Sequence, residues 1–88
     1  MDIQRIEAAA ERLRGHARVT PLLSSPFLDE IAGRRVLVKP ECLQHTGSFK
    51  YRGARSAVSA LTDAQRSQGV IAYSSGNHAQ GVALAAQQ

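Results

Sequence analysis

Aromatic residues, cysteine and long apolar runs are all scarce in this chain of 88 residues, and each scarcity excludes a class of protein. Two Phe, two Tyr and no Trp provide no ladder of aromatic faces on which nucleic-acid bases could stack. The single cysteine, Cys42, allows no internal disulfide, which agrees with a reducing compartment. No apolar run approaches the roughly 20 residues that span a bilayer. We therefore expect a cytoplasmic protein without a membrane partner.

The chain is basic, but its positive charges are scattered. Eleven Lys and Arg against seven Asp and Glu give a formal net charge of +4. The arginines are spread between residues 5 and 66 without forming a cluster, so we interpret the excess as solvated surface and expect no nucleic-acid partner. His78 has no second His, Cys or carboxylate at ligand spacing, so no metal site is expected.

Helix signals are clear in the first part of the chain. Apolar residues recur at helical spacing over residues 3–14, and Gly15 is a suitable residue to end that helix. Ser25 followed by Pro26 is a strong helix start, and Gly33 ends the short helix that follows. Further along, "TDAQ" from Thr62 is a capping-box pattern that starts another short helix.

From residue 34 onward the pattern alternates between strand and helix. "RRVLVK" (34–39) and "VIAYS" (70–74) read as short strands, and helices are expected from Ser48 and after Gly76. This order predicts an α/β fold, an open parallel sheet flanked by helices. Two strands are too few for a stable open sheet, and the last helix has no stop signal. We therefore expect an incomplete N-terminal piece, truncated inside a helix.

Two loops at the carboxyl ends of these strands contain the chemically interesting residues. In "QHTGSFK", Lys50 falls in the first turn of a helix, where the helix dipole and partial burial disfavour its ammonium form. A free amine is what attacks an aldehyde, although a surface lysine beside a turn fits the same pattern. In "SSGNH", hydroxyl and backbone N–H groups open a helix and suit an anion, although ordinary capping by Ser75 or Asn77 is the alternative. One shared sheet would bring Lys50 and Asn77 together.

Together the two loops carry a resemblance to a known family. The chain resembles the fold type II pyridoxal-phosphate enzymes (the tryptophan synthase β type), specifically the threonine/serine dehydratases and serine racemases. The matching segments are "TPLLSSPFLDE" (20–30), "VLVKPECLQHTGSFKYRGA" (36–54) and "GVIAYSSGNHAQGVALAA" (69–86). By this resemblance, residues 1–88 are the N-terminal portion of a catalytic domain. The order of "TGSFKYRGA" does not fit a phosphate-binding NTPase loop.

The resemblance also implies roles for individual residues. Lys50 would form a Schiff base with pyridoxal 5'-phosphate and later remove the α-proton of the substrate. Phe49 would contact the cofactor ring and Asn77 its hydroxyl. The substrate carboxylate would be held by the second loop, through Ser74, Ser75, Gly76 and His78. Ser75 matches the position that, in the racemases, faces the cofactor side opposite the lysine, so it is a second catalytic candidate.

The implied activity is that of an ammonia-lyase that converts L-threonine or L-serine to a 2-oxo acid and ammonia. Serine racemase or 3-hydroxyaspartate dehydratase activity is equally compatible with Ser75, and a catalytically inactive truncated remnant is a third possibility. The full-length form would be a homo-oligomer. The glycine-rich loop that holds the cofactor phosphate in this family is absent here, and Lys39, Arg52 and Arg55 are better explained by salt bridges than by phosphate binding. We expect the 88 residues alone to bind the cofactor weakly and to be inactive.

Overall fold

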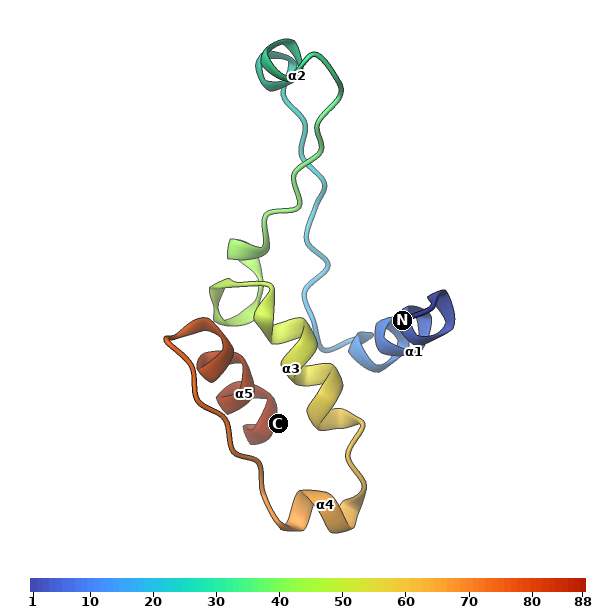
Figure 1. Ribbon diagram of the computed structural model, residues 1–88, viewed down its shortest axis with the longest axis vertical. Coiled ribbons are helices and arrows are strands. Elements are labelled where there is room, and N and C mark those ends of the chain that lie inside the picture. Colours follow the sequence, from blue (N-terminus) through green and yellow to red (C-terminus); the bar gives the residue numbers. More distant parts are fainter.

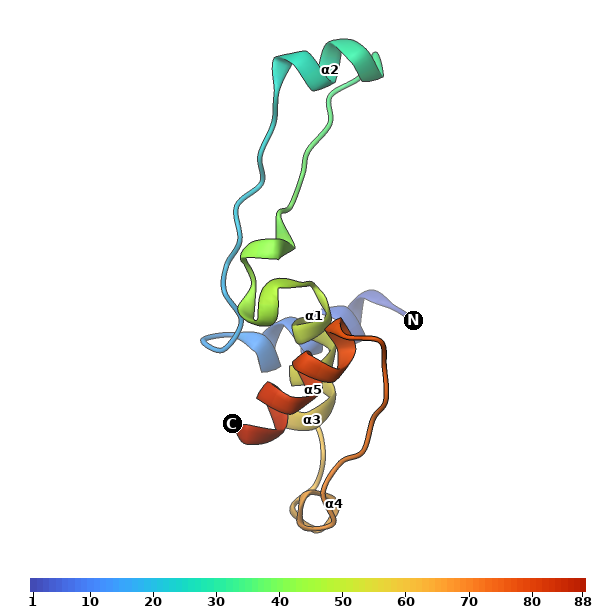
Figure 2. The same cartoon turned by 90° about the vertical axis from the view of Figure 1, so that its left-hand side faces the viewer.

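A computed structural model describes residues 1–88 and contains helices but no strand. The molecule is elongated, with extents of 53 × 30 × 23 Å. An arm that carries one helix projects from a body of packed helices, as two perpendicular views show (Figures 1 and 2). None of the helices is both long and apolar enough to cross a bilayer. The elements are α1 (Ile3–Leu13), α2 (Pro26–Ala32), η1 (Glu41–Leu43), η2 (His45–Gly47), α3 (Lys50–Ser59), α4 (Asp63–Ser67) and α5 (Asn77–Gln87).

Most helix ends lie where the sequence predicts them. The Ser25 hydroxyl accepts a hydrogen bond at the start of α2, and Gly33 ends that helix in the left-handed conformation. Thr62 and Gln65 form the predicted capping box of α4, with each side chain bonded to the other's backbone N–H. These features are confirmed because a cap depends only on residues within one turn of it.

The body of the molecule is held together by α3 and α5, which lie side by side (Figure 1). Tyr51 is completely buried between them, Ala54 and Ala85 are nearly so, and the Tyr51 hydroxyl donates to Gln88 Oε1 at 2.8 Å. Small residues allow the two helices to approach closely. A Cβ added to Gly81 would stand 3.3 Å from backbone atoms of Lys50 and Tyr51.

The arm is formed by the extended segments on either side of α2. The segments meet in one antiparallel bridge, in which Leu23 and Val38 exchange backbone hydrogen bonds of 2.8 Å. The Asp29 carboxylate accepts from the Val36 N–H and ties α2 to the returning segment. Large apolar side chains on the arm stay in water, with Phe27 79% and Ile31 85% exposed. The arm therefore has almost no core of its own.

The predicted parallel sheet is not formed by residues 1–88. Segment 34–39 pairs only at Val38, and its partner is the antiparallel Leu23 rather than segment 70–74. Segment 70–74 has no regular secondary structure and no ladder partner, and Ile71 and Tyr73 are 99% and 96% exposed. Both segments have strand-like sequences, but a strand is defined by its neighbours, and these two segments do not lie beside each other.

Candidate functional site

Lys50 lies in the first turn of α3, as the sequence predicts, although the helix begins at Lys50 with Phe49 rather than Ser48 as its N-cap residue. Its backbone N–H donates to the Ser48 hydroxyl at 3.3 Å, so Ser48 satisfies one of the free N–H groups of the first turn. The Lys50 side chain is exposed, and its Nζ lies 5.3 Å from the centroid of the 61%-exposed Phe49 ring. None of the ion pairs of the chain involves it. The expected partial burial of Lys50 is therefore not observed, because this side of α3 is open.

The second loop leads into α5 in a conformation that leaves several N–H groups free. The Ser74 hydroxyl accepts from the N–H groups of Gly76 at 3.1 Å and Ala79 at 2.9 Å, so Ser74 caps the helix. The N–H groups of Ser75, Asn77 and His78 make no hydrogen bond within the chain. Three free donors at the positive end of an 11-residue helix suit a carboxylate or another anion.

The two loops lie together, although the sheet that was expected to align them is missing. Gly81, one helical turn after Asn77, packs directly on the backbone of Lys50. The helix α5 also contacts η2, the turn that precedes Lys50. Helix α5, which follows the "SSGNH" loop, is thus packed directly on α3 and on the turn before Lys50, without the predicted sheet.

A strained turn immediately precedes the lysine. Thr46 has a φ of 62° and is the only non-glycine residue with positive φ, and Gly47 follows with a φ of 78°. A β-branched residue in the left-handed region is costly, so the surroundings must hold it there. The Thr46 hydroxyl is buried and has no hydrogen-bond partner.

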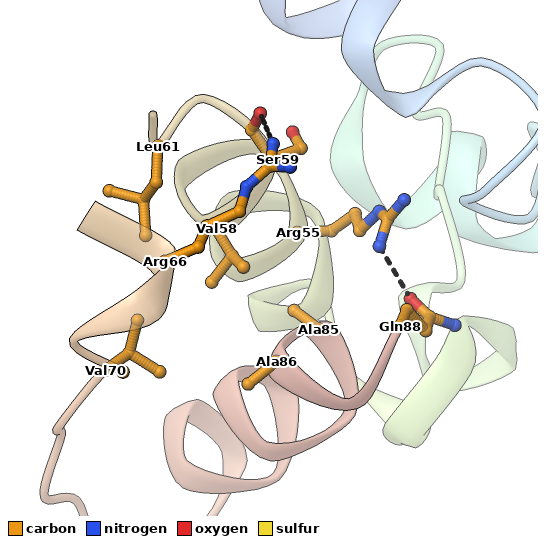
Figure 3. A pocket seen from close by; sticks show the side chains of 10 residues that line it. Arg55, Val58, Ser59, Leu61, Arg66, Val70, Ala85, Ala86 and Gln88 are labelled. Carbon is orange, nitrogen blue, oxygen red and sulfur yellow. Dashed lines mark hydrogen bonds between the residues drawn. The ribbon is translucent and has the colours of Figure 1, made fainter. Parts of the chain in front are cut away.

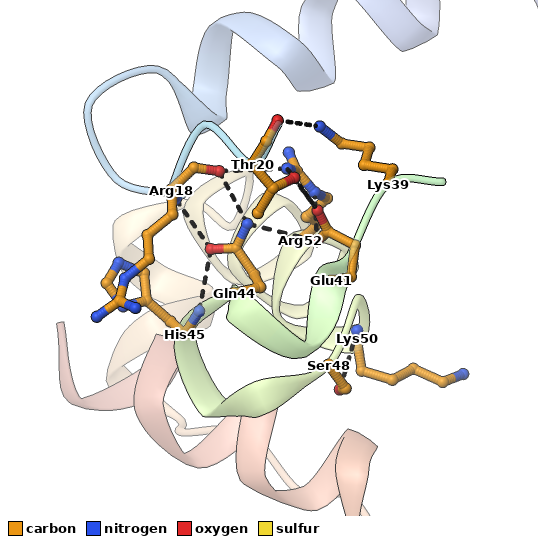
Figure 4. Close-up of polar contacts among 9 residues, drawn as sticks. All are labelled: Arg18, Thr20, Lys39, Glu41, Gln44, His45, Ser48, Lys50 and Arg52. Atoms are coloured by element: carbon orange, nitrogen blue, oxygen red, sulfur yellow. Dashed lines mark hydrogen bonds and ion pairs between the residues drawn. The ribbon is translucent and has the colours of Figure 1, made fainter. Parts of the chain in front are cut away.

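A polar cluster, which we define as Thr20, Glu41, Gln44 and Arg52, lies on the other side of this turn (Figure 4). Arg52 Nε and Nη2 donate to the two oxygens of Glu41 at 2.8 and 2.9 Å, and the Thr20 hydroxyl donates to the same carboxylate at 2.6 Å. Hydrogen bonding from Arg52 and Thr20 lowers the pKa of Glu41 from 4.5 to about 2.

Arg52 is therefore confirmed as a salt-bridge residue, as the sequence suggested. Lys39 Nζ donates to the Thr20 carbonyl at 3.1 Å, and Arg55 contacts Gln88 and the His16 ring, so neither is in an ion pair. The role of Gln44 was missed. Its side chain bonds to Arg18, which is 26 residues away, and no local pattern signals a contact of that range.

A half-open pocket lies away from the lysine, between the far ends of α3 and α5 and the helix α4 (Figure 3). Its volume is about 220 Å³. It is lined by apolar side chains such as Val58 and Val70 and by Arg55 and Arg66. None of the predicted site residues lines it, so this pocket is not the candidate site.

The arrangement around Lys50 fits one end of pyridoxal phosphate. An accessible primary amine can bond to the cofactor aldehyde, and the free N–H groups at the start of α5 can hold a carboxylate beside it. The absence of a side chain at Gly81 allows α5 to pack this closely on Lys50, because a Cβ at position 81 would push the helix away. The residues present fit the reacting end of the cofactor and the substrate carboxylate.

Comparison with known proteins identifies the family. The family model described as pyridoxal-phosphate dependent enzyme matches residues 13–88. An L-threo-3-hydroxyaspartate ammonia-lyase from Pseudomonas sp is 58% identical over 79 residues, which are 90% of this chain and 25% of the relative. The chain spans about a quarter of the length of the curated relatives it matches.

Solved structures agree with this assignment. Maize serine racemase superposes with a TM-score of 0.91 at 45% identity over 98% of this chain and 27% of that one. The T.th. threonine deaminase superposes with a TM-score of 0.85 at 50% identity over 99% of this chain and 31% of that one. The backbone of residues 1–88 therefore follows the path seen in these enzymes. The chain belongs to the family of pyridoxal-phosphate dependent enzymes, whose cofactor is pyridoxal phosphate.

Proposed function

We propose that this chain provides the lysine-bearing part of an ammonia-lyase that converts L-threonine or L-serine to a 2-oxo acid and ammonia. In this proposal Lys50 is the amine that bonds to the cofactor. The observation that supports it is the packing of α5 on the Lys50 backbone, because the N–H groups that are free of hydrogen bonds open this same helix. The names of similar proteins support the same chemistry, since they include an L-threonine dehydratase from Staphylococcus aureus at 48% identity.

Each residue of the site has a defined task in this proposal. Pyridoxal phosphate, when bound, withdraws electrons from the Cα of an amino acid. Lys50 Nζ would hold the cofactor, and as a free amine it would accept the α-proton of the substrate. The N–H groups of Ser75, Asn77 and His78 hold the substrate carboxylate, and that contact fixes the direction of the Cα–H bond.

The remaining roles concern the cofactor ring and the capping of α5. The Phe49 ring lies beside Lys50 Nζ and would contact the ring of the cofactor. The Asn77 amide would donate a hydrogen bond to the hydroxyl of the cofactor ring. The Ser74 hydroxyl and the Gly76 N–H are bonded to each other. We assign these two residues to shaping the loop, while Ser74 retains a free N–H for the substrate.

Two related activities remain as alternatives with the same residues. Serine racemases at 45–46% identity and the L-threo-3-hydroxyaspartate ammonia-lyase at 58% identity are both among the similar proteins. In a racemase, the Ser75 hydroxyl would exchange a proton with the Cα face opposite Lys50. We also expect the complete enzyme to be a homo-oligomer that acts on small amino acids.

A chimera tests the proposal directly. Residues 1–88 replace the matching quarter of the Pseudomonas relative, and the purified protein is given L-threonine, L-serine and L-threo-3-hydroxyaspartate. Formation of 2-oxo acid is measured, together with the appearance of D-serine from L-serine. We expect release of 2-oxo acid from L-threonine and L-serine, whereas net D-serine formation would favour the racemase alternative.

Two charge-preserving variants of the chimera show whether the lysine carries the reaction. Lys50→Arg keeps the positive charge but cannot bond to the aldehyde, so turnover is expected to fall by at least about a thousandfold. Lys39→Arg is the matched control, and it is expected to retain activity, because a guanidinium can still donate to the Thr20 carbonyl. Full turnover in Lys50→Arg would refute the assignment. A folded chimera that binds the cofactor but turns over none of the substrates would favour an inactive remnant.

A further inference from the structure

We propose that Gln44 is a positioning residue for Lys50: its side-chain amide holds the turn that aims the lysine, without touching the reacting atoms. This inference rests on the proposed function, because it takes Lys50 as the reacting amine. It extends that function to Gln44, a residue earlier in the same loop that is only 3% exposed.

The Gln44 amide has a partner for each of its polar groups. Its Oε1 accepts from the backbone N–H groups of Arg18 at 2.9 Å and His45 at 3.1 Å. Its Nε2 donates to the Arg18 carbonyl at 2.9 Å and to Glu41 Oε2 at 3.4 Å. Arg18 is therefore paired through both its N–H and its C=O, as it would be with a neighbouring strand. The side chain of Gln44 takes the place of such a strand.

The same cluster reaches α3 through Arg52. This residue holds the Glu41 carboxylate with two hydrogen bonds and also donates to the Arg18 carbonyl at 3.2 Å. Residues two positions apart on a helix point in nearly opposite directions. Arg52 thus ties one side of the first turn of α3 to the cluster, and Figure 4 shows the Lys50 side chain extending away from it.

The turn between Gln44 and Lys50 is the part that needs holding. Thr46 lies in the left-handed region with a φ of 62° and its hydroxyl has no partner, so this conformation is not favoured locally. Gln44 fixes the start of the turn through the His45 N–H, and Ser48 fixes its end through the Lys50 N–H. Loss of the Gln44 contacts should let the turn relax and Lys50 move away from α5.

The test compares Gln44→Glu with Gln4→Glu, which makes the same chemical change at an exposed position on α1. A carboxylate at position 44 would face both the Arg18 carbonyl and Glu41, and it cannot donate to either. Thr20→Val is a milder second variant that removes the hydroxyl bond to Glu41 and the 3.5 Å bond that the same hydroxyl accepts from Arg52. Circular dichroism checks that each variant keeps its helix content.

Two readouts are taken on the intact chain. The first is amide hydrogen exchange of residues 41–50 without cofactor. The second is labelling by an excess of pyridoxal phosphate followed by borohydride, with Lys50 quantified against the Met1 amine by peptide mass spectrometry. In Gln44→Glu we expect roughly tenfold faster exchange at His45 and a roughly tenfold lower Lys50:Met1 ratio. Thr20→Val should lower the ratio by about threefold, and Gln4→Glu should change neither readout.

The outcomes separate the possibilities. Faster exchange with an unchanged Lys50:Met1 ratio would overturn the inference, because Gln44 would then be only structural. If Gln44→Glu fails to fold, Thr20→Val decides: a lowered ratio supports the inference and an unchanged one overturns it. If Lys50 of the wild-type chain is labelled no more than the Met1 amine, the proposed function is overturned and this inference with it. A Lys50 preference that is insensitive to Gln44→Glu would overturn this inference alone.

Discussion

The Glu41–Arg52 pair provides the most quantitative prediction. The Glu41 carboxylate is held by Arg52 and Thr20, the Glu41 side chain is 14% exposed, and the pKa of Glu41 is lowered from 4.5 to about 2. We predict that Glu41→Gln lowers the free energy of unfolding substantially at neutral pH, because the variant removes the charge but keeps the shape of the side chain.

The magnitude follows from the difference between the two pKa values. A difference of about 2.5 units corresponds to roughly 3 kcal/mol, and partial exposure of Arg52 reduces this to about 2 kcal/mol. Because the pKa is lower in the folded state, the stabilisation is fully present above about pH 4.5. It is lost as the pH falls from 4.5 to about 2, where the folded carboxyl also becomes protonated.

Urea unfolding followed by circular dichroism at pH 7 and pH 2.5 measures this effect. The difference in the free energy of unfolding between wild type and Glu41→Gln should shrink from about 2 kcal/mol at pH 7 to a small fraction of that at pH 2.5. Glu11→Gln is the control, since Glu11 pairs with Arg14 at 2.8 Å but both side chains are exposed. A difference that is equal at both pH values, or no larger than that of Glu11→Gln, would show that the Glu41 charge does not stabilise the fold.

Three further predictions concern the packing, the turn and the cofactor. Gly81→Ala should cost about 1–3 kcal/mol, because its Cβ would press on the α3 backbone at 3.3 Å. Gly53→Ala, where a Cβ meets nothing within 4 Å, should instead stabilise α3 by about 0.5–1 kcal/mol, and urea unfolding of both variants tests the contrast. Thr46→Gly should relieve positive-φ strain and raise the free energy of unfolding by up to about 1 kcal/mol, and an unfolding midpoint shifted downward would contradict that. The chain without further segments should bind pyridoxal phosphate weakly, and a strong visible absorbance band at micromolar cofactor would show that the glycine-rich phosphate loop is dispensable.

What the sequence predicts well is local. The cap at Ser25, the capping box at Thr62 and the left-handed Gly33 depend on residues a few positions apart, and each is found where expected. Lys50 at the start of a helix is local in the same sense. Its open surroundings could not be predicted in this way, because burial depends on which distant segments cover that side of α3.

What the sequence predicts poorly depends on partners far along the chain or on neighbours that residues 1–88 do not provide. Segments 34–39 and 70–74 have strand composition, yet they do not pair with each other and neither forms a strand. Their path still matches solved family members, with a TM-score of 0.91 for maize serine racemase. Gln44 illustrates the other limit: its partner Arg18 lies 26 residues away, and nothing in "ECLQHTG" indicates that contact.

The central claim is that the Lys50 amine is the group that takes up the cofactor. The most direct measurement is a peptide map of the chain after treatment with pyridoxal phosphate and borohydride, which is simple because Lys39 and Lys50 are its only lysines. Lys39 Nζ is engaged with the Thr20 carbonyl, whereas the Lys50 side chain is exposed and only its backbone is packed against Gly81 of α5. We predict that the label is found mainly on Lys50. An equal distribution between the two lysines, or a preference for Lys39, would contradict the account.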